Sequence, residues 1–142
     1  MASTSLPYMV SFVINRKGHV LDGTPILDAI RTIDGASTRP PLGYLVNCAY
    51  PSFLCAAEQS TELFSRLIGF QGNASSADHS ELDGSKELRM DSLNHWGDEM
   101  LSLNQQYGVK MLGGCCGTGV EHLRYLTEKL AFRTQTGSGS RR

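Results

Sequence analysis

Short apolar runs alternate with stretches of helical periodicity along the chain, and this alternation constrains the fold more than any other feature. The runs are rich in β-branched and aromatic residues, as expected for buried strands. They predict strands over 8–14, 44–48, 67–73 and 109–112. Strands that alternate with helices favour an α/β fold with a parallel sheet, in which ligands bind at the carboxyl ends of the strands.

A helical segment is predicted after each strand. The first helix has Thr24 as its expected cap and Gly35 as its expected stop, and the last opens with an expected capping box of Thr118 and Glu121. The second segment begins at Pro51. The third is marked by an apolar stripe at spacings of three and four, formed by Leu93, Trp96, Met100, Leu103 and Tyr107. The chain therefore contains four predicted β-α units.

The length of 142 residues suits a single domain with a sizeable core. It is too short for a complete eight-unit α/β barrel, which usually needs about 250 residues. We expect one domain over 1–133 and a polar, flexible tail over 134–142.

The charge balance excludes several classes of partner. Thirteen Lys and Arg residues face fourteen Asp and Glu residues, a net charge of -1, so electrostatics favours neither nucleic acid nor an anionic membrane. Apolar runs fall far short of the roughly 20 residues that span a bilayer, and the start lacks the charged region of a signal peptide. We expect a soluble, cytoplasmic protein.

Three of the four cysteines follow predicted strands. Cys48 ends the second strand, while Cys115 and Cys116 follow the fourth. Inward residues of alternate strands share a layer in a barrel-like sheet, and the glycines around the cysteine pair permit a bend that turns both thiols the same way. Three thiolates without a fourth protein ligand are typical of a catalytic zinc site that keeps one position open.

The same residues allow other interpretations. Cys48 alone is the kind of small side chain often found in cores, and Cys115 with Cys116 could form a vicinal disulfide or simply pack. The glycine run 113–119 joins a strand to a helix, as a phosphate-binding loop does. Cys55 is interpreted as core. The histidines, interpreted as surface or packing residues, are His19, His79, His95 and His122.

Several short motifs occur together in this chain. Gly113-Gly114-Cys115-Cys116-Gly117-Thr118 is preceded far upstream by Val46-Asn47-Cys48. Further motifs are Ser11-Phe12, Leu21-Asp22-Gly23-Thr24-Pro25 and Gly72-Asn73-Ala74-Ser75. With these motifs, the chain resembles the homocysteine S-methyltransferase family over about residues 7–131.

The resemblance implies a zinc ion held by Cys48, Cys115 and Cys116. Homocysteine sulfur would take the open position and attack a methyl donor, which is S-methylmethionine, S-adenosylmethionine or a betaine-like compound, to give methionine. Asn73 is the candidate for a displaceable fourth ligand or a substrate contact. A loop asparagine that bonds the backbone is the other interpretation of this residue.

The resemblance also implies a TIM-type (β/α)8 barrel of which this chain is the C-terminal half, with four β-α units. The units that carry much of the substrate pocket would precede it. Two functions follow as expectations: a zinc-dependent methyltransferase fragment that needs the missing half for activity, or a non-catalytic zinc-binding or assembly module. Partners in the second case are another copy of this chain or a complementary N-terminal half-barrel.

Overall fold

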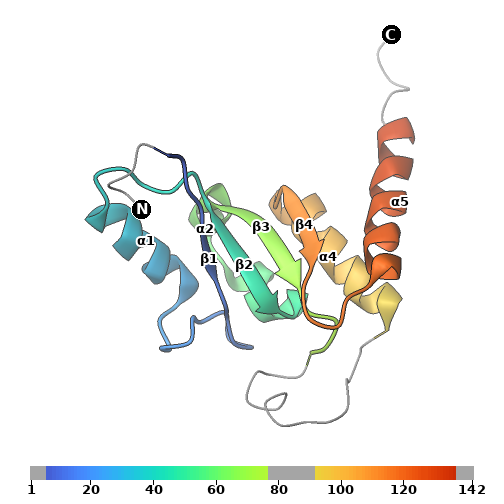
Figure 1. The fold of residues 1–142 in the computed structure, drawn as a ribbon, viewed down its shortest axis with the longest axis horizontal. Coiled ribbons are helices and arrows are strands. Elements are labelled where there is room, and N and C mark those ends of the chain that lie inside the picture. The colour runs from blue at the N-terminus through green and yellow to red at the C-terminus, as the bar shows by residue number, and fades with distance from the viewer. Residues whose placement is uncertain (1–5, 77–91, 137–142) are drawn as a thin grey trace.

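Four parallel strands form one sheet in a computed structural model that describes residues 6–76 and 92–136. The strands lie side by side in chain order, as Figure 1 shows, which confirms the predicted parallel α/β sheet. They are β1 (Val10–Phe12), β2 (Tyr44–Ala49), β3 (Leu67–Gly72) and β4 (Met111–Gly114). The helices are α1 (Ile26–Ala36), α2 (Thr61–Arg66), α4 (Leu93–Tyr107) and α5 (Val120–Thr136), with two short 3-10 helices, η1 (Pro51–Leu54) and η2 (Ala56–Glu58).

The two edge strands differ in length or position from their predictions. β1 ends at Phe12, because Ile14 turns away to form an antiparallel bridge with Val20. β4 begins two residues later than expected. Val109 is fully buried but its N–H bonds the carbonyl of Leu103, so this residue closes the end of α4 and does not pair with β3.

Both predicted boundaries of the first helix are also wrong, and the second helical segment begins at Pro51 as predicted but is not continuous. Helix α1 follows Pro25 without a side-chain cap and runs past Gly35 to Ala36, while the N–H of Thr24 bonds the Asp22 carboxylate. The segment after Pro51 is broken into η1, η2 and α2 because Cys55 adopts a left-handed conformation, with φ 49°. The end of α4 is confirmed, since Gly108 takes the left-handed conformation there.

The start of α5 corrects the predicted capping box. Thr118 donates its hydroxyl to the carbonyl of Cys115, 2.7 Å away, instead of accepting from the helix. The reciprocal bond is shifted by one residue, because Nδ1 of His122 accepts from the N–H of Gly119 at 3.1 Å. The helix thus begins after Gly119, with His122 in the position where Glu or Gln usually stands in a capping box. Helix α5 continues to Thr136, and the rest of the expected tail lies outside the described residues.

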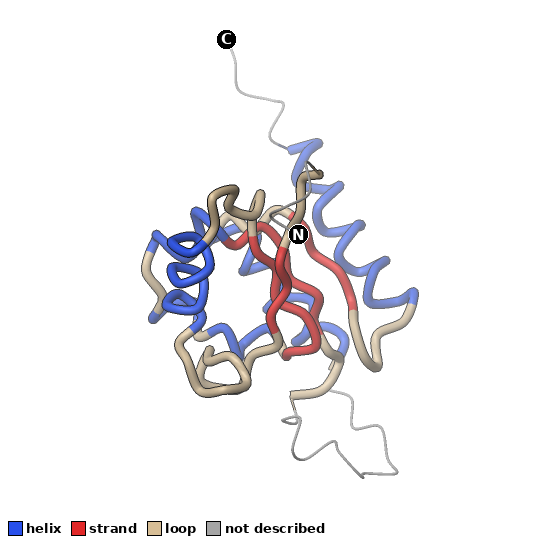
Figure 2. Tube along the Cα trace, turned by 60° about the vertical axis from the view of Figure 1, so that its left-hand side comes forward, coloured by secondary structure: helices blue, strands red, loops and turns tan. Residues whose placement is uncertain are grey.

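One face of the sheet carries the core. Paired positions Phe12, Val46, Phe70 and Leu112 form a row across all four strands that packs with the helices. The next row is Ser11, Leu45, Gly69 and Met111, on the opposite face, where Ser11 and Met111 are exposed. Figure 2 shows the strands lying together between helical segments. Among the described residues, no helix has both the length and the hydrophobicity needed to cross a membrane.

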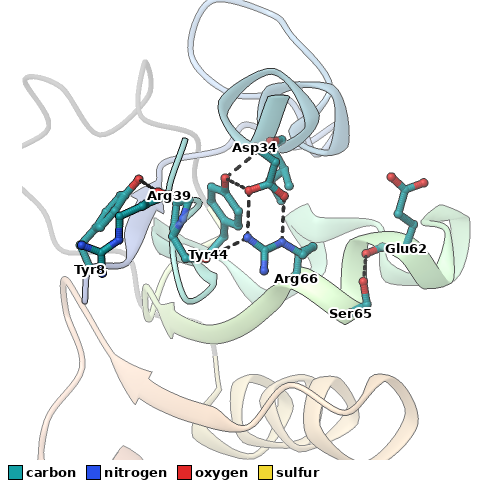
Figure 3. Close-up of polar contacts among 9 residues, drawn as sticks. Tyr8, Asp34, Arg39, Tyr44, Glu62, Ser65 and Arg66 are labelled. Atoms are coloured by element: carbon teal, nitrogen blue, oxygen red, sulfur yellow. Dashed lines mark hydrogen bonds and ion pairs between the residues drawn. The ribbon is translucent and has the colours of Figure 1, made fainter. Parts of the chain in front are cut away.

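An ion-pair network ties helices α1 and α2 to the amino-terminal end of β2 (Figure 3). Arg66 donates from Nε and Nη2 to the two carboxylate oxygens of Asp34, at 2.9 and 2.8 Å, and Nη2 also bonds the carbonyl of Pro41. Tyr44 donates its hydroxyl to Asp34 at 2.8 Å. Burial opposes the ionised carboxylate, but these bonds outweigh it and lower the pKa of Asp34. Burial and the neighbouring carboxylate raise the pKa of Tyr44 to about 12.

Replacing Arg66 by Met is expected to destabilise the fold at pH 7. The loss should be about 1 to 2 kcal/mol, above the usual value for surface pairs because this pair is bidentate and only about a quarter exposed. A carboxylate with a lowered pKa stabilises the fold above its ordinary pKa of 3.8 and loses that effect as the pH falls through its folded pKa. Urea unfolding at pH 7 and at pH values below 3.8 measures both effects.

Arg31→Met is the matched control, because the pair that Arg31 makes with Glu62 is also bidentate but about half exposed, so its loss should change little. Equal effects of the two substitutions, or an Arg66→Met effect that does not shrink in acid, would contradict the assigned role of the network.

Candidate metal centre

Three cysteine thiols converge at the carboxyl end of the sheet. Cys48 lies near the end of β2, and Cys115 and Cys116 directly follow β4, with β3 between them. The Sγ atoms of Cys48 and Cys115 are 2.8 Å apart, and those of Cys115 and Cys116 are 4.0 Å apart. All three lie within 4.8 Å of one another. The predicted convergence of alternate strands therefore occurs in this structure.

A bulge in β2 turns Cys48 toward the other two thiols. Asn47 pairs with Gln71 and Ala49 with Gly72, so Cys48 is the extra residue between two paired positions. Strict alternation would place its side chain on the same face as Val46, against the helices. Instead Cys48 takes φ 52°, a conformation that residues with a side chain seldom adopt. The strain is thus located at the residue whose side chain enters the cluster.

Backbone hydrogen bonds hold the loop that carries the other two cysteines. The N–H of Cys115 bonds the carbonyl of Gly72 at 2.8 Å, and the carbonyl of Cys116 accepts from Ala74 at 3.0 Å. Thr118 then closes a turn on the carbonyl of Cys115 through both its N–H and its hydroxyl. Gly117 supplies the left-handed conformation that this turn requires, with φ 77°. The expected bend is present, and β3 is the element that fixes its position.

The thiols of Cys48 and Cys115 differ in acidity. Burial and, after it, the hydrogen bond with the Cys115 thiol raise the pKa of Cys48 to about 11. Burial acts in the same direction on Cys115, but hydrogen bonds from the Cys48 thiol and from backbone N–H groups outweigh it and lower the pKa of Cys115. Cys115 is therefore the more acidic thiol of the pair. A metal ion that bound both thiols would displace their protons.

Asn73 is placed directly after β3, between the two cysteine-bearing strands. Its side chain is buried, with 4% of the residue exposed, and its backbone N–H bonds the carbonyl of Ala49 at 2.9 Å. Within the described residues, its side-chain oxygen has no hydrogen-bond partner. A buried carbonyl oxygen without a donor is a position that a ligand or metal can satisfy. The alternative interpretation, a loop asparagine whose side chain bonds the backbone, would have to use the amide nitrogen, because the oxygen makes no such bond here.

Other candidate residues lie apart from the cluster. Cys55 is partly exposed and not in the core, with its thiol directed at the carbonyl of Arg16. His19 is half-buried and His95 exposed, while His79 lies outside the described residues. His122 is fully buried.

Two residues next to the cysteine cluster make contacts there that were not predicted from the sequence. Asn47 precedes Cys48 and accepts a hydrogen bond from the hydroxyl of Ser11 at 2.5 Å, and its side chain acts to lower the pKa of Cys48. His122 caps the helix that follows the cysteine loop. The available signal for His122 was its place three residues after Gly119, where a capping side chain reaches back to the helix start.

The vicinal disulfide and the phosphate-binding loop were the alternative interpretations of residues 113–119. Cys115 and Cys116 are free thiols in the structure, so they form no vicinal disulfide. A phosphate cradle needs backbone N–H groups that point into the loop. Those of Cys115, Thr118 and Gly119 already bond the carbonyls of Gly72 and Cys115 and the imidazole of His122.

The thiol geometry suits a tetrahedral ion bound by sulfur. Zinc binds thiolates at about 2.3 Å, which places tetrahedral sulfur ligands about 3.8 Å apart. The observed separations of 2.8 and 4.0 Å lie on either side of this value, so the thiols can hold one ion after small side-chain rotations. Soft thiolates favour zinc over magnesium or calcium.

Fold and site together define an α/β protein with a parallel sheet and a three-thiol centre at its carboxyl edge. The family model described as homocysteine S-methyltransferase matches residues 1–130, and the chain belongs to this family. Neither a curated protein nor a solved structure matches the chain.

Proposed function

We propose that this chain is a zinc-dependent homocysteine S-methyltransferase domain that transfers a methyl group to the sulfur of homocysteine and yields methionine. The observation that carries the proposal is the convergence of the Cys48, Cys115 and Cys116 thiols within 4.8 Å. Family membership supports the choice of homocysteine and a methyl donor as substrates. Four free cysteines also favour work in a reducing compartment, which we propose to be the cytoplasm.

Each residue of the centre has a distinct part in this proposal. Cys48, Cys115 and Cys116 would hold the ion, and Asn73, whose side-chain oxygen is buried without a partner just after β3, would be a displaceable fourth ligand or a contact of the substrate. Zinc bound by thiolates lowers the pKa of an incoming thiol, which makes the homocysteine sulfur a nucleophile at neutral pH. The bulge at Cys48 and the turn at Gly117 keep the ligands preorganised for this step.

Methyl transfer is a displacement at carbon. The homocysteine sulfur forms a bond to the methyl carbon while the bond from that carbon to the donor's sulfur or nitrogen breaks, and the donor leaves with the electron pair. S-methylmethionine, S-adenosylmethionine and betaine-like donors all carry a positively charged leaving group. We further propose that a second four-strand half-barrel supplies the donor pocket, so that this chain contributes the zinc ligands.

Zinc content tests the site independently of turnover. We expect one zinc ion per chain in the purified protein and in Cys55→Ser, because Cys55 lies outside the cluster. Cys115→Ser should lose most of the metal, since it removes the central thiol of the three. Elemental analysis after dialysis measures the ratio, and an equal, negligible zinc content in all three proteins would refute the zinc site.

Turnover then distinguishes an enzyme from a metal-binding module. Methionine formation from S-methylmethionine and homocysteine by the zinc-loaded chain supports the methyltransferase as a self-sufficient unit. Zinc binding without turnover favours the second candidate function, a non-catalytic zinc-binding or assembly module, or a fragment that needs its other half.

One observation favours assembly. Within the described residues, β1 pairs with β2 alone and β4 with β3 alone, so both sheet edges are open. Met9 beside β1 and Met111 in β4 are 47% and 42% exposed, and Val120 and Leu123 on α5 are also exposed. Open edges with exposed apolar neighbours are features that native proteins usually cover. We propose that a second copy covers them, with β1 of each chain next to β4 of the other.

Light scattering during size-exclusion chromatography measures this assembly. The chain is expected to elute at twice the 15.5 kDa of one copy, and Met111→Lys should shift it toward the monomer by placing a charge at the β4 edge. Leu21→Lys is the control, because Leu21 is 72% exposed in the loop after β1 and belongs to neither edge strand. A folded monomer at every concentration would exclude the second copy and leave a complementary half-barrel chain as the partner to test.

A further inference from the structure

His122 is a buried polar residue that the proposed chemistry does not use. Only 1% of the residue is exposed, although it lies on α5 directly after the cysteine loop. Its ring packs edge-on against the indole of Trp96, with centroids 4.9 Å apart and an interplanar angle of 86°. Trp96 is itself fully buried on α4, and a Cβ at Gly72 would contact its indole. The imidazole on α5 therefore packs against α4, through an indole that itself lies next to Gly72 at the end of β3.

The hydrogen bond that His122 makes has a defined direction. Nδ1 accepts from the N–H of Gly119 at 3.1 Å. The carbonyl of Gly119 accepts from the N–H groups of His122 and Leu123, and the imidazole bond adds a link from its N–H to the same helix. Burial protects the bond from competition by water.

The cysteine loop is anchored at both ends by different elements. Its first half is tied to β3, through the bonds between Cys115 and Gly72 and between Cys116 and Ala74. Its second half turns at Gly117 and Thr118 and reaches α5 at Gly119, whose N–H donates to Nδ1 of His122. Loss of the second anchor would free the turn that Thr118 closes on the carbonyl of Cys115.

We propose that His122 is a positioning residue of the three-thiol centre. By accepting the N–H of Gly119, the imidazole fixes the exit of the loop and so holds the thiols of Cys115 and Cys116 in the arrangement that binds the ion. The proposal rests on the proposed zinc site. His122 would act on that site only through the backbone of Gly119, without contact to the thiols or the substrate. Groups that orient metal ligands from behind typically change metal affinity 10- to 100-fold when removed.

Two substitutions separate the hydrogen bond from the packing. His122→Leu keeps an apolar side chain against Trp96 and removes the acceptor. His122→Asn loses the ring but places its side-chain oxygen where Nδ1 stands, so it can still accept from Gly119. Leu126→Ala is the matched control, because Leu126 is buried one turn further along α5 and its truncation weakens the helix packing without altering the loop bond.

Zinc affinity by competition with a chromophoric chelator is the principal measurement, with thermal unfolding in EDTA as the stability readout. We expect His122→Leu to bind zinc at least tenfold more weakly than the wild type, and His122→Asn and Leu126→Ala to stay within about threefold. The two controls should nevertheless unfold at lower temperature. Wild-type affinity in His122→Leu, or equal losses in all three variants, would overturn the proposal.

A second readout needs no metal. In the zinc-free proteins, hydrogen exchange of the Gly119 amide should be faster in His122→Leu than in the wild type or His122→Asn. If the wild type binds no zinc, the zinc site of the proposed function fails, while this exchange pattern still decides whether His122 anchors the loop. Equal exchange rates in the three proteins would show that it does not.

Discussion

The parallel pairing of β2, β3 and β4 is the constraint on which the thiol centre depends. Parallel strands end at the same edge of a sheet, so residues far apart in sequence meet there without a long connecting loop. β3 lies between the two cysteine-bearing strands and is bonded to both. The carbonyl of Ala49 at the end of β2 accepts from the N–H of Asn73, and the carbonyl of Gly72 accepts from the N–H of Cys115. Because these bonds run through the backbone of β3, the separation between Cys48 and Cys115 follows from strand spacing and not from side-chain packing alone.

The two ends of the sheet carry different tasks. At the amino-terminal end, Arg66, Asp34 and Tyr44 form a bidentate, partly buried network that joins two helices to a strand (Figure 3). At the carboxyl end lie a left-handed Cys48, a buried oxygen of Asn73 without a partner, and thiols with unequal pKa values. Stabilising contacts are thus kept apart from the strained and underbonded groups, as is common where a site needs reactive side chains.

The sequence alone predicted the parallel α/β sheet, the order of its elements and the set of three cysteines. These features follow from local patterns: apolar runs, helical spacing, and cysteines placed after strands. The bulge at Cys48 could not be predicted, because it depends on how β2 registers with β3. The capping role of His122 was missed for a similar reason. Thr118 and Glu121 fit the usual capping box, but the observed bond lies one residue later, between Gly119 and His122. The half-barrel interpretation and the division at residue 133 remain predictions.

X-ray absorption spectroscopy at the zinc edge counts the ligand atoms around the ion and so tests the three-thiol zinc site. We expect three sulfur atoms at about 2.3 Å and one lighter atom in the zinc-loaded chain. Addition of homocysteine should replace the lighter atom with a fourth sulfur. Fewer than three sulfur ligands in the loaded chain would contradict the assignment of Cys48, Cys115 and Cys116, and three sulfurs that do not become four would contradict homocysteine as the incoming ligand.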